Sequence, residues 1–195
     1  MARTFIGKTV SALPSFWILC LLLPSLLAGV PILQNKPQTR IASIGCFINV
    51  QSRGEHDFGY SVRLWFRGDQ IIGLIEYHRG LAGNPPIGIL TDVRYDARSG
   101  KLLFKAKLTS GFHSCRIHEN VPSHDMLTFK GFLKPDGLVG DIRLEDRLDS
   151  PPTVVDERES LVMLRAVDCI TKNYPNYNEW WKDWEAAYEA RGAKW

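Results

Sequence analysis

The residues of this 195-residue chain that are best suited to chemistry gather in one short segment. They are His113, Cys115, His118, His124 and, directly after them, Asp125. Neutral imidazole and thiolate are ligands that zinc and copper prefer, and a carboxylate can orient a ligating histidine. The three histidines and the cysteine have the chemistry to hold zinc or copper, and a metal-dependent enzyme at this cluster is the third hypothesis for the function. We favour the alternative that these are loop residues, because residues 122–125 are typical of a turn.

No other stretch of the sequence carries a catalytic signature. The G-x-S-x-G turn of serine hydrolases is absent, and so are the glycine-rich loops that bind dinucleotides or nucleoside triphosphates. We therefore predict no catalytic residue and no cofactor other than the zinc or copper ion just described.

The charge balance argues against a nucleic-acid partner. The chain has 24 Lys and Arg residues and 21 Asp and Glu residues, and Arg3 and Lys8 are the only charged residues among the first 28. The rest of the chain is therefore nearly neutral, whereas proteins that bind DNA or RNA present a basic surface.

The N-terminus has the layout of a secretory signal peptide. Arg3 and Lys8 precede the apolar run 16–28, which as a helix is shorter than the hydrocarbon core of a bilayer. We predict that residues 1–28 are a signal peptide, that 29–40 form a linker, and that the protein is exported to a periplasm or secreted. The alternative is an uncleaved anchor over residues 16–33, which would be the protein's only contact with a membrane.

Export changes the interpretation of the cysteines. Cys20 lies in the signal, so Cys46, Cys115 and Cys169 remain, and in an oxidising compartment two of them are expected to pair. We favour Cys46–Cys115, because both lie in strand-like runs, although spacing alone leaves the other pairings open. Three buried thiols are the alternative.

Residues 41–168 repeat a pattern of short alternating runs separated by turn signals, which predicts an all-β domain. We expect an antiparallel meander barrel of about eight strands. The run 160–167 is too short to distinguish a strand from a helix. One face of the run 60–66 is apolar and consists of Tyr60, Val62, Leu64 and Phe66. We predict that these residues line a ligand site inside the barrel.

The C-terminal segment 169–195 predicts an amphipathic α-helix. Asn176 is a suitable N-cap, and Glu179 completes a capping-box pattern. Tyr177, Trp181, Trp184 and Tyr188 then share one face, flanked by Trp180. We expect this aromatic helix to pack on the barrel. The alternative is that it binds a partner protein through Trp180, Trp181, Trp184 and Tyr188.

The succession of hairpins followed by a helix resembles the lipocalin and calycin barrels. Gly45-Cys46-Phe47 stands where that family has Gly-x-Trp, with Phe in place of Trp, and Thr91-Asp92 resembles its Thr-Asp motif. The resemblance implies an eight-stranded barrel that holds a small apolar or amphipathic ligand. A non-enzymatic ligand-binding protein is therefore the leading hypothesis. A structural or interaction protein of the cell envelope, with a filled barrel and a partner-binding aromatic helix, is the second.

Overall fold

The computed structural model describes residues 39–81, 85–110, 121, 123–148, 150–169 and 171–190. The predicted signal and nearly all of the predicted linker lie outside these residues. Within them the alternating runs form nine strands, and the aromatic segment forms one helix. The elements are β1 (Ile41–Ile48), β2 (Gln51–Arg53), β3 (His56–Arg67), β4 (Gln70–Leu81), β5 (Ile87–Asp96), β6 (Lys101–Lys107), β7 (Asp125–Lys134), β8 (Gly137–Asp146), β9 (Thr153–Arg165) and α1 (Tyr177–Ala190).

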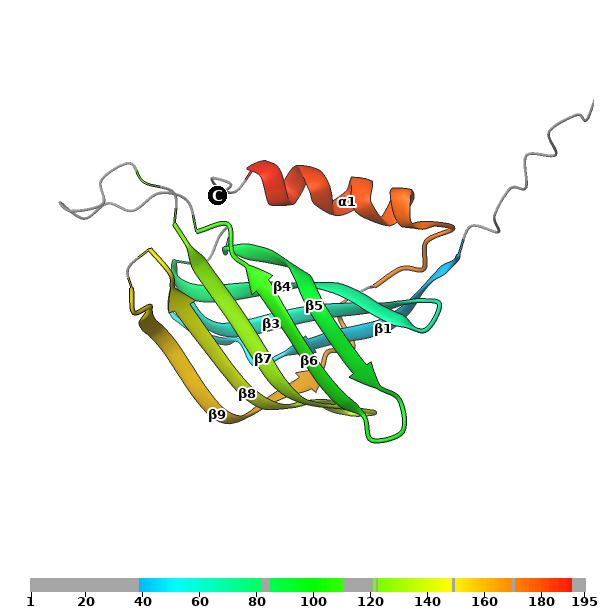
Figure 1. Cartoon of the computed structure of the whole chain (residues 1–195), viewed down its shortest axis with the longest axis horizontal. Coiled ribbons are helices and arrows are strands. Elements are labelled where there is room, and N and C mark those ends of the chain that lie inside the picture. Colours follow the sequence, from blue (N-terminus) through cyan, green and yellow to red (C-terminus); the bar gives the residue numbers. More distant parts are fainter. Residues whose placement is uncertain are drawn as a thin grey trace, which may run out of the picture. The chain divides into compact units, whose positions relative to one another are not determined.

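The strands form a closed antiparallel meander barrel with lipocalin-like architecture (Figure 1). From β3 to β9 each strand pairs with the next, and β1 closes the barrel by pairing with both β3 and β9. Eight strands therefore make the barrel, and β2 is an extra strand that pairs with the beginning of β3. The predicted fold is confirmed, and the run 160–167 is a strand as far as Arg165.

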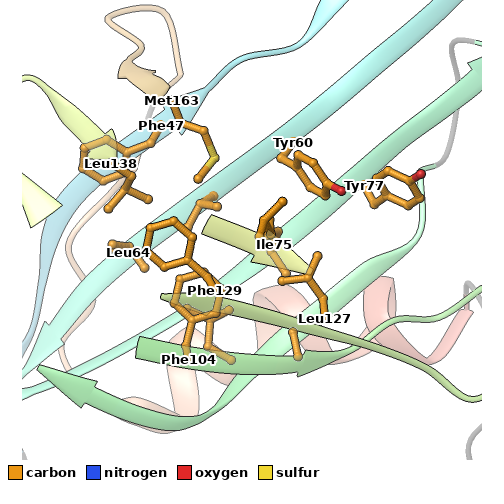
Figure 2. Close-up of a cluster of buried hydrophobic side chains, with 14 of the residues drawn as sticks. Phe47, Tyr60, Leu64, Ile75, Tyr77, Phe104, Leu127, Phe129, Leu138 and Met163 are labelled. Atoms are coloured by element: carbon orange, nitrogen blue, oxygen red, sulfur yellow. The ribbon is translucent and has the colours of Figure 1, made fainter. Parts of the chain in front are cut away.

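Alternation along each strand separates the filled interior of the barrel from its outer wall. On β3 the side chains of Tyr60, Val62 and Leu64 point inward and are buried, and Phe66 is partly buried against them. Rings from other strands fill the remaining space, such as the stacked pair Phe104 and Phe129, whose centroids are 5.0 Å apart (Figure 2). The predicted inward face of residues 60–66 is therefore correct, and the middle of the barrel is occupied by its own side chains.

The side chain of Arg165 packs against the barrel at the end opposite β2. Its guanidinium lies 5.1 Å from the centroid of the Phe47 ring and donates hydrogen bonds to the carbonyl oxygens of Ile44 and Pro135. Gly45 makes room for this arrangement, because a Cβ there would lie 2.5 Å from Arg165 Nη1 and its φ is +146°. Packing of Arg165 against β1 therefore explains why position 45, in the Gly-Cys-Phe run, requires glycine.

The disulfide joins Cys46 to Cys169, so the favoured pairing of Cys46 with Cys115 is wrong. The end of β9 runs beside β1, where Ala166 N donates to the Cys46 carbonyl oxygen. This pairing carries the chain that follows β9 back to Cys46, with 5.8 Å between the two Cα atoms. Cys115 lies outside the described residues. A disulfide of this kind indicates an oxidising compartment.

Helix α1 packs on the outer wall of the barrel through its aromatic residues (Figure 1). Asn176 caps it as predicted, since its Oδ1 accepts a hydrogen bond from Glu179 N at 3.0 Å. Trp180, which we placed at the flank of the aromatic face, is the most deeply buried residue of that face, and its ring centroid lies 5.8 Å from that of Trp65. The partly buried residues around it are Tyr177, Trp181, Trp184 and Tyr188. Contact of these side chains with a partner protein stays a prediction.

Candidate functional site

A cavity of about 390 Å³ opens at the end of the barrel that carries β2; we call it the mouth cavity. It exists because the closing seam of the barrel is short. β1 pairs with β9 only at Phe47–Arg165 and Ile48–Leu164, so along the rest of its described length β9 pairs with β8 alone. The space between β9 and the strands β2 to β4 is lined by Asn49, Gln51, Arg53, Phe58, Gly59, Tyr60, Tyr77, His78, Asp156, Arg158 and Leu161.

Asn49 sets the position of Tyr60 at the inner edge of this cavity. The chain leaves β1 at Asn49, whose N–H donates to the Tyr60 carbonyl oxygen and whose Oδ1 accepts from Tyr60 N at 2.7 Å. A Cβ on residue 59 would lie 2.8 Å from the Asn49 carbonyl oxygen, and Gly59 has a φ of +129°, so this close approach requires glycine.

The tyrosines of the cavity form its floor, and an ion pair forms one side. The rings of Tyr60 and Tyr77 stack with centroids 5.1 Å apart, and Figure 2 shows their hydroxyl groups pointing the same way. Tyr60 donates from its hydroxyl to Asp156 Oδ2 at 2.7 Å, and Arg158 Nε donates to Asp156 Oδ1 at 3.0 Å. The cavity thus has an aromatic half and a charged half.

Burial favours the neutral forms of Tyr60, Tyr77 and His78 in the cavity. Desolvation, together with the hydrogen bond to Asp156, raises the pKa of Tyr60 far above its usual value. Desolvation also raises the pKa of Tyr77 and lowers the pKa of His78. At neutral pH both phenols therefore keep their protons, and the charged side chains that line the cavity are those of Arg53, Asp156 and Arg158.

Substitution of Tyr60 by Phe is expected to change the response of the protein to alkaline pH. The folded state raises the Tyr60 pKa above its usual 10.0, so its contribution to stability is complete below that pH and is lost as pH rises further. Urea unfolding between neutral pH and about pH 11 should show a smaller alkaline loss for Tyr60→Phe than for the wild type. At neutral pH the variant should lose about 1–2 kcal/mol with its hydrogen bond. An unchanged alkaline slope would contradict this assignment.

The structure separates the four residues predicted to bind a ligand. Tyr60 lines the mouth cavity, whereas Val62 and Leu64 are 0% exposed and Phe66 packs against Tyr95. Sequence analysis missed the other ten lining residues, among them Tyr77, Asp156 and Arg158. Tyr77 lies on β4, where its period-two spacing with the buried Ile75 marks it as inward. Asp156 and Arg158 lie in the first half of β9, which was not assigned to any element.

The predicted metal ligands His113, Cys115 and His118 lie outside the described residues. His124 immediately precedes β7, where its carbonyl oxygen accepts a hydrogen bond from Arg147 N. Within the described ranges, no group of three or more His, Cys, Asp or Glu side chains is placed to hold a metal ion. The zinc or copper site stays a prediction.

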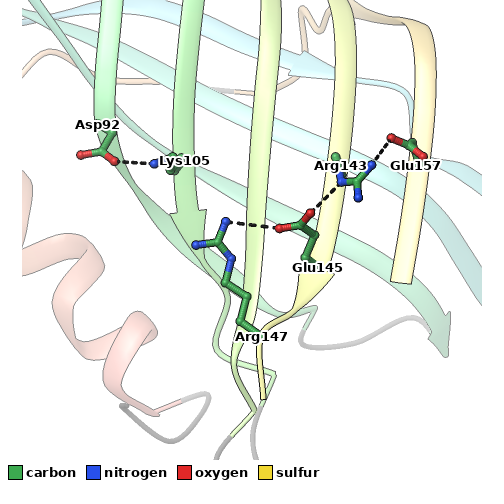
Figure 3. A network of polar contacts seen from close by, with 6 residues as sticks. All are labelled: Asp92, Lys105, Arg143, Glu145, Arg147 and Glu157. Carbon is green, nitrogen blue, oxygen red and sulfur yellow. Dashed lines mark hydrogen bonds and ion pairs between the residues drawn. The ribbon is translucent and has the colours of Figure 1, made fainter. Parts of the chain in front are cut away.

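Charged side chains of both signs alternate on the outer wall formed by β5 to β9 (Figure 3). Arg143 bridges Glu145 and Glu157 at 2.7 and 2.8 Å, and Lys105 pairs with Asp92 at 3.0 Å. Exposed pairs of this kind contribute little to stability, because water screens the attraction between their charges. The six residues drawn in Figure 3 combine three basic with three acidic side chains.

None of the helices among the described residues is long and apolar enough to cross a membrane. Comparison of the chain with protein family models, with curated proteins and with solved structures finds no match. The lipocalin-like architecture is therefore established by the strand pairing of the chain itself.

Proposed function

We propose that this protein binds a small amphipathic molecule, without transforming it, in the mouth cavity. The observation that carries the proposal is the mixed lining of the cavity, in which the rings of Tyr60 and Tyr77 come from β3 and β4 and the ion pair of Asp156 with Arg158 comes from β9. Small-molecule sites are typically concave and mostly apolar, with a few polar groups that orient the ligand. A volume of about 390 Å³ suits such a site.

The filled interior limits how deeply the ligand enters. Below the tyrosines the core side chains of Leu64, Ile75 and Leu127 are buried and pack on one another. The ligand that we propose therefore rests on the rings of the two tyrosines. It enters the mouth cavity beside β9. This supports a compact ligand rather than a long chain threaded through the barrel.

We further propose that binding takes place outside the cytoplasm, in a periplasm or after secretion. The Cys46–Cys169 disulfide indicates an oxidising compartment. The basic residues Arg3 and Lys8, followed by the apolar run 16–28, supply the expected export signal.

Native mass spectrometry of the purified full-length protein tests the binding proposal. We expect an excess mass of a few hundred daltons that is lost on denaturation, and a higher melting temperature when the released molecule is added back. Leu161→Trp, which fills the cavity, should abolish both effects. Leu103→Trp makes the same change on the outer wall and should preserve them.

A bare chain mass, with no stabilisation by a panel of small amphiphiles, would contradict ligand binding. It would favour the second candidate, an interaction protein of the cell envelope with a filled barrel. The observations that support this candidate are the packed interior and the apolar side chains of Val162 and Leu164, which are 48% and 61% exposed on β9.

A further inference from the structure

Several hydrogen-bond acceptors of the mouth cavity already receive a hydrogen bond from the protein. Both carboxylate oxygens of Asp156 are engaged, one by Tyr60 and the other by Arg158. The side-chain oxygen of Asn49 accepts from Tyr60 N. The hydroxyl oxygen of Tyr77 has Arg79 as its hydrogen-bonding partner. The carboxylate of Asp156 and the amide oxygen of Asn49 are therefore already held by donors of the protein.

Some hydrogen-bond donors of the cavity, by contrast, remain available. Arg158 uses only Nε, so its two terminal nitrogens have no partner among the described residues, and the side chain of Arg53 makes no hydrogen bond or ion pair with any of them. The Nε2 atom of His78, which is a donor in one tautomer of the neutral ring and an acceptor in the other, is also without a partner in this part of the chain. The two arginines and Asp156 give the lining an excess of one positive charge.

The other half of the cavity accepts an apolar body. The stacked rings of Tyr60 and Tyr77 present a flat surface, and Phe58, which is 42% exposed, and Leu161 lie at its edges. Flat apolar groups pack well on such rings. The unpaired donors and the positive charge therefore lie beside a surface suited to an aromatic or branched apolar group.

We propose that the ligand is an apolar monocarboxylic acid, whose carboxylate is held by the Arg158 guanidinium and whose body lies on the Tyr60–Tyr77 pair. This inference rests on the proposed function and names its ligand class. A guanidinium donates two parallel hydrogen bonds to a carboxylate, which a neutral amide or alcohol cannot match in strength. Arg53 adds a second positive charge at the cavity.

A shallow groove on the outer wall is a second place where an apolar carboxylic acid could bind. Its volume is about 480 Å³, and its lining includes the apolar Leu103 and Phe132 beside the cations of Arg94 and Lys130. It lacks the stacked tyrosines and lies more open to solvent. A test of the proposal must therefore separate Arg158 from Arg94.

The test compares 2-naphthoate with its uncharged isostere 2-naphthamide, each titrated calorimetrically into the full-length protein. We expect the acid to bind at least about tenfold more tightly than the amide at low salt, with the difference shrinking as salt is added. Arg158→Gln should remove most of that preference and leave amide binding unchanged. Arg53→Gln should reduce it in part, and the matched control Arg94→Gln should leave it intact.

The remaining outcomes overturn the inference in distinguishable ways. Equal binding of acid and amide would refute carboxylate recognition while supporting a small-molecule site. Loss of acid binding in Arg94→Gln but not in Arg158→Gln would move the site to the outer groove. If neither compound binds, the ligand class is wrong, and native mass spectrometry of the wild type decides separately whether the protein carries any small molecule.

Discussion

Replacement of Cys46 and Cys169 by alanine should lower the free energy of unfolding by about 4–5 kcal/mol. The two residues are 123 positions apart, so the disulfide closes a loop that contains almost the whole barrel. A cross-link over so long a loop restricts the unfolded chain strongly in the chain-entropy description. It also holds the short β1–β9 seam, where only two residue pairs connect the strands.

The measurement is urea unfolding of the C46A/C169A variant and of the wild type, with and without reductant. The reduced wild type should match the double variant. Cys115→Ala is the matched control and should unfold like the wild type under both conditions. A large loss in Cys115→Ala, with none in Cys169→Ala, would restore the pairing that the sequence alone favoured.

Trp180→Ala should destabilise the protein by about 3–5 kcal/mol, in the range found when large buried rings are truncated. Trp180 is 1% exposed and lies between the helix and the wall, with its ring near those of Trp65 and Tyr177. Loss of the ring leaves a cavity at the centre of the contact that holds α1. The C-terminal segment should therefore loosen before the barrel unfolds.

Chemical unfolding, monitored by near-ultraviolet circular dichroism, measures both the loss of stability and the earlier loosening of the C-terminal segment. Trp181→Ala is the comparison, because Trp181 is on the same helix but only partly buried, and its substitution should cost clearly less. If the two variants were equally stable, Trp180 would not be the anchor of the helix. A Trp180→Ala variant as stable as the wild type would mean that α1 adds no stability to the barrel.

The disulfide and the contact made by Trp180 both involve the segment of the chain that follows β9. The disulfide, the bridge between Ile41 and Tyr174 and the hydrogen bond from Trp65 Nε1 to the Lys172 carbonyl oxygen all attach the segment after β9 to the barrel wall. The mouth cavity lies toward the other end of β9, where pairing with β1 is absent. One end of β9 is therefore attached to the barrel wall by covalent and hydrogen bonds, whereas the other end lacks pairing with β1. The proposed site lies at the end that lacks this pairing.

Most of the fold follows from local patterns in the sequence. The alternation in residues 60–66 correctly predicts that Tyr60, Val62 and Leu64 point inward, because side chains on a strand alternate between its two faces. The residues 134–137 mark the turn between β7 and β8, since Pro and Gly favour the backbone angles that a turn needs. Asn176 marks the beginning of α1, because its side chain caps a free backbone N–H. Each of these features depends on residues close together in the chain.

The features that were wrong or missed depend on residues far apart in the chain. Cys169 reaches Cys46 only because β9 returns beside β1 to close the barrel, a contact that no local spacing encodes. Trp180 becomes the centre of the helix contact because Trp65, Leu74 and Ile87 form the wall that receives it. Asp156 meets Tyr60 across the open seam for the same reason. Local patterns therefore determine the strands and the helix, whereas closure of the barrel determines the disulfide, the helix contact and the cavity, because only closure brings distant residues within bonding distance.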